Sequence, residues 1–446
     1  MSVRVGAVAA MACTVGLFLP VATETAGAVT AASGAGAYQP LAPTRITDTR
    51  PGSGQPNAGM KLRPAGTLNV TVPAAVPATA TAVSLSVTAV DGTSNGYLTV
   101  YPTGQAPLSP TSDVNYVPGS PGCSVPSCTV SNLVVSKVNG GQVTIANGSS
   151  TGSVDVVVDL EGYFDPTTAS SGVGHFFPMA PYRVADTRCG SPAPPSLCAD
   201  ETQLTTHTAS PGPAGVLDVP LTPVSMPGLG IGAAEVQVTA TTTSAPGFLT
   251  AYAGGATRPT ASNVNFAPGE TASNRAIVPV GPNGDINIYN SAGKTDVVVD
   301  VVGLFGDGTG VNAATTGSLY TPIVPARLAD TRSDAGALGP NTSATFPVAG
   351  QGTIPADVSG SITAAALNVT EASATAPGFL SVTPSTQTPP VTTSDVNFVG
   401  GQIRANADLA ELGSDGSVSL YNSAGTTQVL IDAFGYFTPA SSPSQG

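Results

Sequence analysis

Short runs in which apolar and polar residues alternate follow one another along the whole chain, and Gly, Pro, Asn or Asp separates them. The spacing of apolar residues that indicates an amphipathic helix is nearly absent. Gly140-Gly141 between two such runs can adopt the positive φ values that a tight hairpin needs. In the first third of the chain this pattern predicts strands at 67–72, 82–90, 96–102, 112–117, 131–138, 142–146 and 153–164.

The same pattern is written three times. The opening motif PLAPTRITDTR (40–50) returns as PMAPYRVADTR (178–188) and PIVPARLADTR (322–332). The closing motif VVVDLEGYF (156–164) returns as VVVDVVGLF (297–305) and VLIDAFGYF (429–437). Seven or eight short strands in a repeat of about 125 residues is typical of a β-sandwich. We therefore predict an all-β protein of three tandem β-sandwich modules, jelly-roll or immunoglobulin-like.

The boundaries follow from these motifs and from Gly/Thr-rich stretches typical of linkers. We expect a signal peptide at 1–28 and an N-terminal tail at 29–37. The modules then span 38–164, 176–305 and 320–437, with linkers at 165–175 and 306–319 and a C-terminal tail at 438–446.

The first residues predict export. Arg4 precedes an apolar stretch that runs from Val5 to Ala22, and Ala26-Gly27-Ala28 is a plausible cleavage site. Lipidation at Cys13 is the alternative, but too few apolar residues precede it. No other segment has the roughly 18 apolar residues of a membrane-spanning helix. We expect a secreted protein, extracellular or associated with the cell wall.

The charge composition argues against some classes of binding partner. The formal net charge is −13, and only three lysines follow the signal peptide: Lys61, Lys137 and Lys294. Such a chain lacks the basic surface of proteins that bind nucleic acid or anionic membranes. Charged residues are 9% of the chain, so Thr, Ser, Asn and Gln must supply most of the polar surface.

Two pairs of cysteines lie in segments that are longer than their counterparts in the other repeats. Four cysteines allow three pairings. Their separate positions favour two local disulfides, one in the first repeat and one in the second. No His or acidic cluster accompanies either pair, which argues against a metal site. The predicted bridges are Cys123–Cys128 and Cys189–Cys198.

The recurring charged residues are the strongest candidate constellation. Six of the ten arginines after residue 28 occupy two recurring positions, an Asp stands between them, and a further Asp recurs inside the apolar closing strand. A carboxylate there is costly to bury unless an Arg fork pairs with it. We expect an ion-pair network between the opening segment and the closing strand, with a ligand-binding cluster as the alternative. The residues are Arg45, Asp48, Arg50 and Asp159; Arg183, Asp186, Arg188 and Asp300; Arg327, Asp330, Arg332 and Asp432.

Recurring amides and two tyrosines are weaker candidates. Asn side chains in loops commonly fix turns through their own backbone, and a sugar or Ca²⁺ site is the alternative. No EF-hand-type loop supports calcium. Tyr101 and Tyr252 are candidate sugar-stacking residues, although the third repeat has Thr383 there and the chain has no Trp. The candidate amides are Asn115, Asn132, Asn265, Asn274, Asn397 and Asn406.

Catalysis has little support in the sequence. His175 and His207 do not recur between repeats, so a Ser-His-Asp or Cys-His apparatus lacks a repeated base. A pair of carboxylates, as in glycosidases, is not distinguished from the other acids. We expect no enzyme and no cofactor.

With these motifs in view, residues 38–437 resemble a repeat family of secreted proteins from high-GC Gram-positive bacteria. Its pattern runs from P-x-R-x-x-DTR through PGYLTVYP and SNxN[YF] to VVDVxGYF. The resemblance implies a surface or wall-associated accessory role and supplies no catalytic residues. We expect a non-enzymatic structural or binding protein of the cell surface, whose partner would be a cell-wall or extracellular polysaccharide or a surface protein. The alternatives are a carbohydrate-binding protein with one shallow site per module and, third, a glycoside or wall hydrolase.

Overall fold

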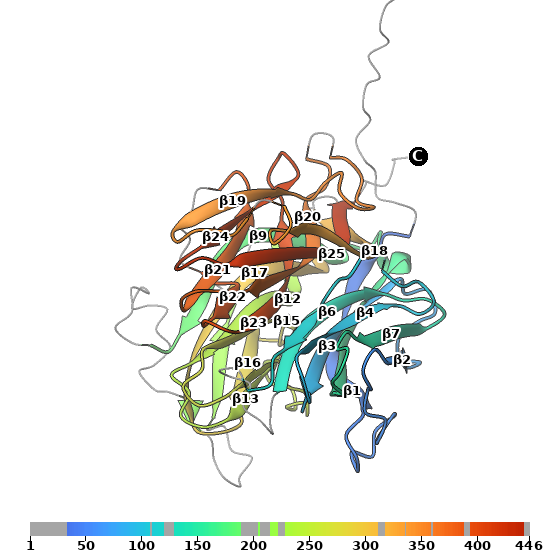
Figure 1. Ribbon diagram of the computed structural model, residues 1–446. Coiled ribbons are helices and arrows are strands. Elements are labelled where there is room, and N and C mark those ends of the chain that lie inside the picture. The colour runs from blue at the N-terminus through green and yellow to red at the C-terminus, as the bar shows by residue number, and fades with distance from the viewer. Residues whose placement is uncertain are drawn as a thin grey trace, which may run out of the picture.

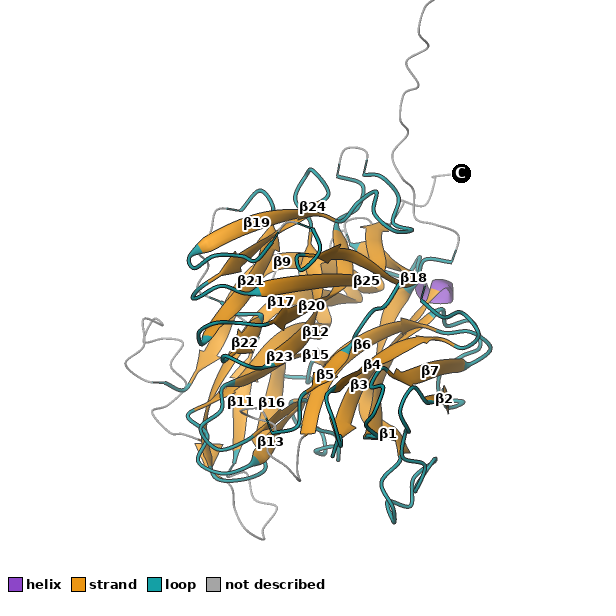
Figure 2. Ribbon diagram, in the orientation of Figure 1, coloured by secondary structure: helices purple, strands orange, loops and turns teal. Residues whose placement is uncertain are grey.

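The chain was analysed in a computed structural model that describes residues 34–107, 109–119, 129–188, 204–205, 215–221, 228–310, 317–334, 336–357, 360–387 and 393–440. Within these ranges regular structure is almost entirely strand, with one 3₁₀ turn, η1 (Pro166–Thr168) (Figure 2). The predicted all-β class is therefore confirmed. The signal peptide and all four cysteines of the predicted disulfides lie outside the described residues.

The first repeat is a sandwich of two four-stranded antiparallel sheets. Its strands are β1 (Ala37–Asp48), β2 (Thr67–Thr71), β3 (Ala82–Val90), β4 (Gly96–Pro102), β5 (Val114–Tyr116), β6 (Thr129–Lys137), β7 (Gln142–Asn147) and β8 (Asp155–Asp165). One sheet has the order β1-β8-β3-β6, and the other has the order β2-β7-β4-β5. This is the strand order of a jelly roll, one of the two sandwich types that the sequence left open.

The other repeats follow the same plan. The second contains β9 (Val173–Asp186), β10 (Leu204–Thr205), β11 (Val216–Pro220), β12 (Leu229–Thr241), β13 (Gly247–Ala253), β14 (Val264–Phe266), β15 (Ala272–Pro279), β16 (Asp285–Asn290) and β17 (Lys294–Gly310). The third contains β18 (Ser318–Asp330), β19 (Thr342–Pro347), β20 (Ala364–Ala372), β21 (Gly378–Pro384), β22 (Val396–Phe398), β23 (Ile403–Glu411), β24 (Ser417–Asn422) and β25 (Gln428–Pro439). Their sheets run β9-β17-β12-β15 with β11-β16-β13-β14, and β18-β25-β20-β23 with β19-β24-β21-β22.

The opening motif of each repeat is itself a strand, which alternation of apolar and polar residues did not predict. Two prolines interrupt β1, and its pairing with β8 shifts register between Pro40 and Thr44. The pairing of β18 with β25 shifts in the same way between Pro322 and Ala326. Proline cannot donate to a ladder and is accommodated at such bulges. Each opening strand therefore pairs with the closing strand of its repeat on both sides of a bulge.

The three sandwiches surround a common centre at which β6, β15 and β23 converge (Figure 1). The inner strands are buried on both faces; in β3, Val83, Leu85 and Val87 pack inside the first sandwich. Ala82, on the other face of that sheet, belongs to a separate apolar cluster to which all three repeats contribute. Each inner sheet thus packs on its own outer sheet on one side and on the neighbouring repeats on the other.

A closed ring of six aromatic side chains is part of this shared core. One ring comes from the first strand of each repeat and one from its last strand. Successive centroids lie 4.4 to 5.0 Å apart, a range favourable for aromatic pairs. Each side chain is at most 1% exposed. In order around this aromatic ring they are Tyr38, Phe164, Tyr320, Phe437, Phe176 and Phe305.

The interpretation of independent repeats joined only by linkers is wrong. The predicted linker 165–175 holds the end of β8, η1 and the start of β9, and His175 is fully buried. In the second predicted linker, β17 continues to Gly310 and β18 begins at Ser318, while 311–316 lie outside the described residues. Ser318 pairs with Phe176, which joins the inner sheets of the second and third repeats. The apolar outer face of each inner sheet needs cover, and the other repeats supply it.

Candidate functional site

Two arginines and two aspartates form the same chain of ion pairs in each repeat. The guanidinium of Arg45, on β1, donates from Nε and Nη2 to the Asp159 carboxylate on β8 at 2.9 and 3.0 Å. Asp48 accepts from Nε and Nη2 of Arg50 at 2.9 and 2.6 Å and lies 3.6 Å from Nη1 of Arg45. The equivalent pairs in the other repeats join Arg183, Asp186, Arg188 and Asp300, and Arg327, Asp330, Arg332 and Asp432.

Exposure rises along each chain of charges. The side chain of the aspartate on the closing strand is 0–2% exposed, the first arginine 16–20% and the second arginine 38–54%. Burial raises the pKa of Asp300, although hydrogen bonds from Arg183 partly offset it. Burial alone would also raise the pKa of Asp48, but hydrogen bonds from Arg50 outweigh it and lower the pKa. The inner half of each chain ties the opening strand to the closing strand, and the outer half reaches solvent.

Three of the candidate amides form a cyclic network between repeats. Each side-chain Oδ1 accepts a hydrogen bond from a backbone N–H of another repeat, at 3.0 to 3.3 Å. Each Nδ2 donates to a backbone carbonyl of its own repeat, at 2.6 or 2.7 Å. Because these amides are 1–2% exposed, their groups are used inside the protein. The backbone N–H of Leu133 donates to Asn274, that of Arg275 donates to Asn406, and that of Ala407 donates to Asn132.

The other three candidate amides lie in the segments that dock one repeat on the next. Asn265 donates to Ser131 of the first repeat, and Asn397 donates to Ser273 of the second, both at 3.0 Å. Asn115 donates to the hydroxyl of Ser112 in its own segment, at 3.3 Å. That segment contacts the third repeat through the backbone N–H of Ser112, which donates to the Asp432 carboxylate at 3.0 Å. We expected these amides to fix turns within their own repeat; Asn115 bonds within its own repeat, whereas Asn265 and Asn397 also bridge repeats.

A buried charge cluster between the second and third repeats was not predicted. Arg275 is 1% exposed, and its Nη2 contacts Asp395 and lies 3.1 Å from Asp408. Glu235 accepts a hydrogen bond from the backbone N–H of Leu409 at 2.9 Å. Burial alone would lower the pKa of Arg275, but the charges of Asp408 and Asp395 outweigh it and raise the pKa. The sequence signal that could have predicted this cluster is Arg275 itself, because the other two repeats have the uncharged residues Leu133 and Ala407 at that position.

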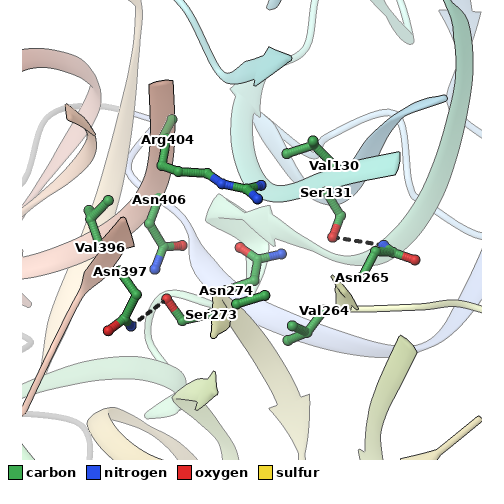
Figure 3. A pocket seen from close by; sticks show the side chains of 12 residues that line it. Val130, Ser131, Val264, Asn265, Ser273, Asn274, Val396, Asn397, Arg404 and Asn406 are labelled. Carbon is green, nitrogen blue, oxygen red and sulfur yellow. Dashed lines mark hydrogen bonds between the residues drawn. The ribbon is translucent and has the colours of Figure 1, made fainter. Parts of the chain in front are cut away.

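A small cavity lies where residues of all three repeats meet (Figure 3). Asn265 and Asn397 are hydrogen-bonded beside it, and Arg404 reaches across it from β23 (Figure 3). The Arg404 guanidinium is paired with Glu270. The cavity has a volume of about 20 Å³, which suits a single water molecule. It is too small for a sugar or a larger ligand.

A larger cleft opens between the first and third repeats, and we call it the 1–3 cleft. Its volume is about 450 Å³, within the range of ligand-binding sites in proteins. The first repeat contributes side chains that include Asn95, Tyr97 and Thr111, and the third contributes Arg327 and Arg332. The cleft therefore gathers an aromatic ring, amides, hydroxyls and the outer half of one chain of charges.

The candidate stacking residues lie elsewhere. Tyr101 is partly buried and Tyr252 is 6% exposed, and neither lines the cavities described above. Tyr97, which the sequence analysis did not single out, lines the 1–3 cleft. His175 is fully buried, and its Nε2 lies 2.7 Å from the backbone oxygen of Ala169; His207 lies outside the described residues.

Metal and membrane features were searched for in the described part of the chain. There, no three or more His, Cys, Asp or Glu side chains are placed to hold a metal ion together. None of the helices described there is long and apolar enough to cross a membrane.

Comparisons with known proteins add little to this geometry. No family model matches the chain, and no curated protein matches it. One similar solved chain comes from work on the triple jelly roll fold and turret assembly in an archaeal virus, at 9% identity over 92% of this chain and 91% of that chain. Another comes from the atomic structure of Sulfolobus Turreted Icosahedral Virus, at 10% identity over 92% of both chains. The TM-score is 0.15 for each, which supports no inference about relationship or function.

Proposed function

We propose that the protein is an exported, non-enzymatic binding protein of the cell surface or cell wall, built as a rigid scaffold of three jelly rolls. The predicted signal peptide and the resemblance to secreted wall-associated repeats support the location. Because the repeats share one core, the molecule would present its surfaces in a fixed relative orientation.

The single observation that carries this proposal is the use of the recurring polar residues. The aspartates of the closing strands are paired with arginines, and the amides Asn132, Asn274 and Asn406 bond the repeats to one another. Buried, paired groups of this kind hold a fold together and are not poised for proton transfer to a substrate. A hydrolase is therefore the weakest of the three candidate functions.

Carbohydrate binding remains the second candidate, because of the 1–3 cleft. Its volume of about 450 Å³ and its mixed aromatic and polar lining suit part of a polysaccharide chain. A surface protein is the other partner class that the proposal allows.

The proposal is tested by incubating the mature protein with cell wall isolated from a high-GC Gram-positive bacterium and measuring the bound fraction after washing. We expect retention on the wall, reduced by soluble wall saccharides. Heat-unfolded protein and an unrelated acidic β-sandwich protein serve as controls. Retention no greater than that of the unrelated protein would contradict the proposed wall association, and release of reducing sugars would contradict the non-enzymatic role.

A further inference from the structure

The first repeat departs from the other two at the 1–3 cleft, at positions where the second and third repeats agree. Before the aromatic residue of its fourth strand it has Asn95, where both others have Pro. The aromatic residue itself is Tyr97, where both others have Phe. After the seventh strand it has Gly148-Ser149-Ser150, where both others have Ser-Ala-Gly. That turn is also two residues longer, since Asn147 and Asp155 are eight positions apart and Asn290 and Asp296 are six.

These differences change the local structure. In the second and third repeats the serine hydroxyl accepts a hydrogen bond from the backbone N–H of Phe248 or Phe379, at 2.7 and 2.8 Å. In the first repeat a Cβ at Gly148 would lie 2.2 Å from Cζ of Tyr97. The Tyr97 ring therefore occupies the space over Gly148, and this position forms part of the cleft wall.

Two hydroxyl groups in the wall have no hydrogen-bond partner among the described residues. Thr111 and Thr370 both line the cleft and are each 1% exposed. Their Oγ1 atoms make no hydrogen bond to any described residue. Buried hydroxyls are normally satisfied by protein or bound water. Because both Oγ1 atoms are themselves buried, a bound water molecule is the partner that fits them, and a ligand in the cleft would not contact them directly.

Arg332 lines the cleft and forms a neutral pair with Asp330, which lies outside the cleft lining. Arg332 is 54% exposed and donates from Nε and Nη2 to Asp330, at 2.8 and 2.5 Å. Those bonds lower the pKa of Asp330, so the carboxylate stays ionised and accepts hydrogen bonds at neutral pH. Because the guanidinium is neutralised and the chain carries a net charge of −13, a polyanion is disfavoured.

We propose that the 1–3 cleft binds one short stretch of a neutral oligosaccharide per molecule. Tyr97 would stack on a sugar ring, and Asn95, Ser150 and Arg332 would contact its hydroxyl groups. This inference rests on the proposed binding function and names its ligand class. It replaces one shallow site per repeat with one site per chain, because the distinctive side chains belong to the first repeat.

The test is a calorimetric titration of the mature protein with linear hexamers of β-1,4-glucose, α-1,4-glucose and β-1,4-N-acetylglucosamine, with an acidic hexamer of galacturonic acid for comparison. We expect a neutral hexamer to bind with a stoichiometry of one. Tyr97→Ala should weaken that binding by about tenfold or more, as for a central aromatic contact. Phe379→Ala, the matched change in the third repeat, should leave the affinity unchanged.

A second variant separates binding from folding. Combining Asn95→Pro and Tyr97→Phe installs residues that the other two repeats already accommodate, and it leaves Gly148, over which the ring lies, unchanged. This variant should melt like the parent and bind the neutral hexamer more weakly. Binding of no neutral hexamer, binding of the acidic hexamer alone, a stoichiometry of three, or full affinity in Tyr97→Ala would each overturn the inference.

Wall binding distinguishes the inference from the proposed function. If the parent and Tyr97→Ala are retained equally on isolated wall, the 1–3 cleft is not the site and the proposed function stands. If the hexamer binds but the parent is not retained on wall, the proposed function fails and the site stands.

Discussion

Removing one member of the aromatic ring tests whether the three repeats unfold as a unit. Phe164 closes the first repeat and is fully buried. Its ring lies 5.0 Å from that of Tyr38 in its own repeat, and 4.4 and 6.2 Å from those of Tyr320 and Phe437 in the third. Phe164→Ala therefore opens a cavity at a boundary between repeats as well as within one.

The size of the expected effect depends on how much of the chain unfolds together. A buried Phe→Ala change costs about 3–5 kcal/mol of unfolding free energy. Unfolding entropy is about 2.1 cal/mol/K per residue near 60 °C. If about 400 residues unfold as one unit, a loss of 4 kcal/mol lowers Tm by about 5 °C. If the first repeat of about 130 residues unfolds alone, the same loss lowers its Tm by about 15 °C.

Differential scanning calorimetry of the mature protein measures both quantities. We expect one transition, a ratio of calorimetric to van't Hoff enthalpy near that of a two-state protein, and a Tm lowered by about 5 °C in Phe164→Ala. Phe266→Ala, in the core of the second sandwich, should shift the same single transition. Two or more transitions in the parent, or a shift of about 15 °C confined to one of them, would refute the shared-core argument.

Three further predictions concern charges and cysteines. Asp300→Ala should lower the unfolding free energy of the whole chain by about 2–3 kcal/mol in urea denaturation. This is less than for a fully buried pair, because Arg183 would still pair with Asp186 and is partly exposed to solvent. Unfolding of the second repeat alone would contradict this prediction. Burial raises the pKa of Glu161 from 4.5 to about 8, so the folded state holds a proton that the unfolded state releases, and up to about 5 kcal/mol of stability should be lost between pH 5 and 9. Glu161→Gln should flatten that part of the pH profile, and an unchanged profile would exclude Glu161 as its source. Non-reducing digestion and mass spectrometry should find Cys123 linked to Cys128 and Cys189 linked to Cys198, and a bridge between repeats would contradict the local pairing.

The strands could be predicted from the sequence because each follows a local rule. The expected segments at 82–90 and 96–102 coincide with β3 and β4, and the segment at 67–72 differs from β2 by one residue. Alternation of Val and Thr, bounded by Gly, Pro or Asn, is readable within a few residues. The strand β1 was missed because Pro40 and Pro43 argue against a strand unless its bulge is known.

The arrangement of the repeats could not be predicted in this way. Ala82 and Leu133 read as ordinary core residues, and nothing local says that they face another repeat. The pairing of Arg45 with Asp159 was predictable because a buried carboxylate needs a partner and few arginines were available. The 1–3 cleft was not, since Tyr97 becomes visible as distinctive only when its place beside the third repeat is known.

The cyclic bonding of Asn132, Asn274 and Asn406 has the form of a homotrimer closed within one polypeptide. In a true trimer each side chain near the axis would occur three times, so a buried Arg275 would meet two copies of itself. Covalent connection removes that restriction and lets each boundary acquire its own chemistry. It also makes assembly a folding event independent of protein concentration. Such a ring stays closed at any dilution, whereas separate subunits would come apart.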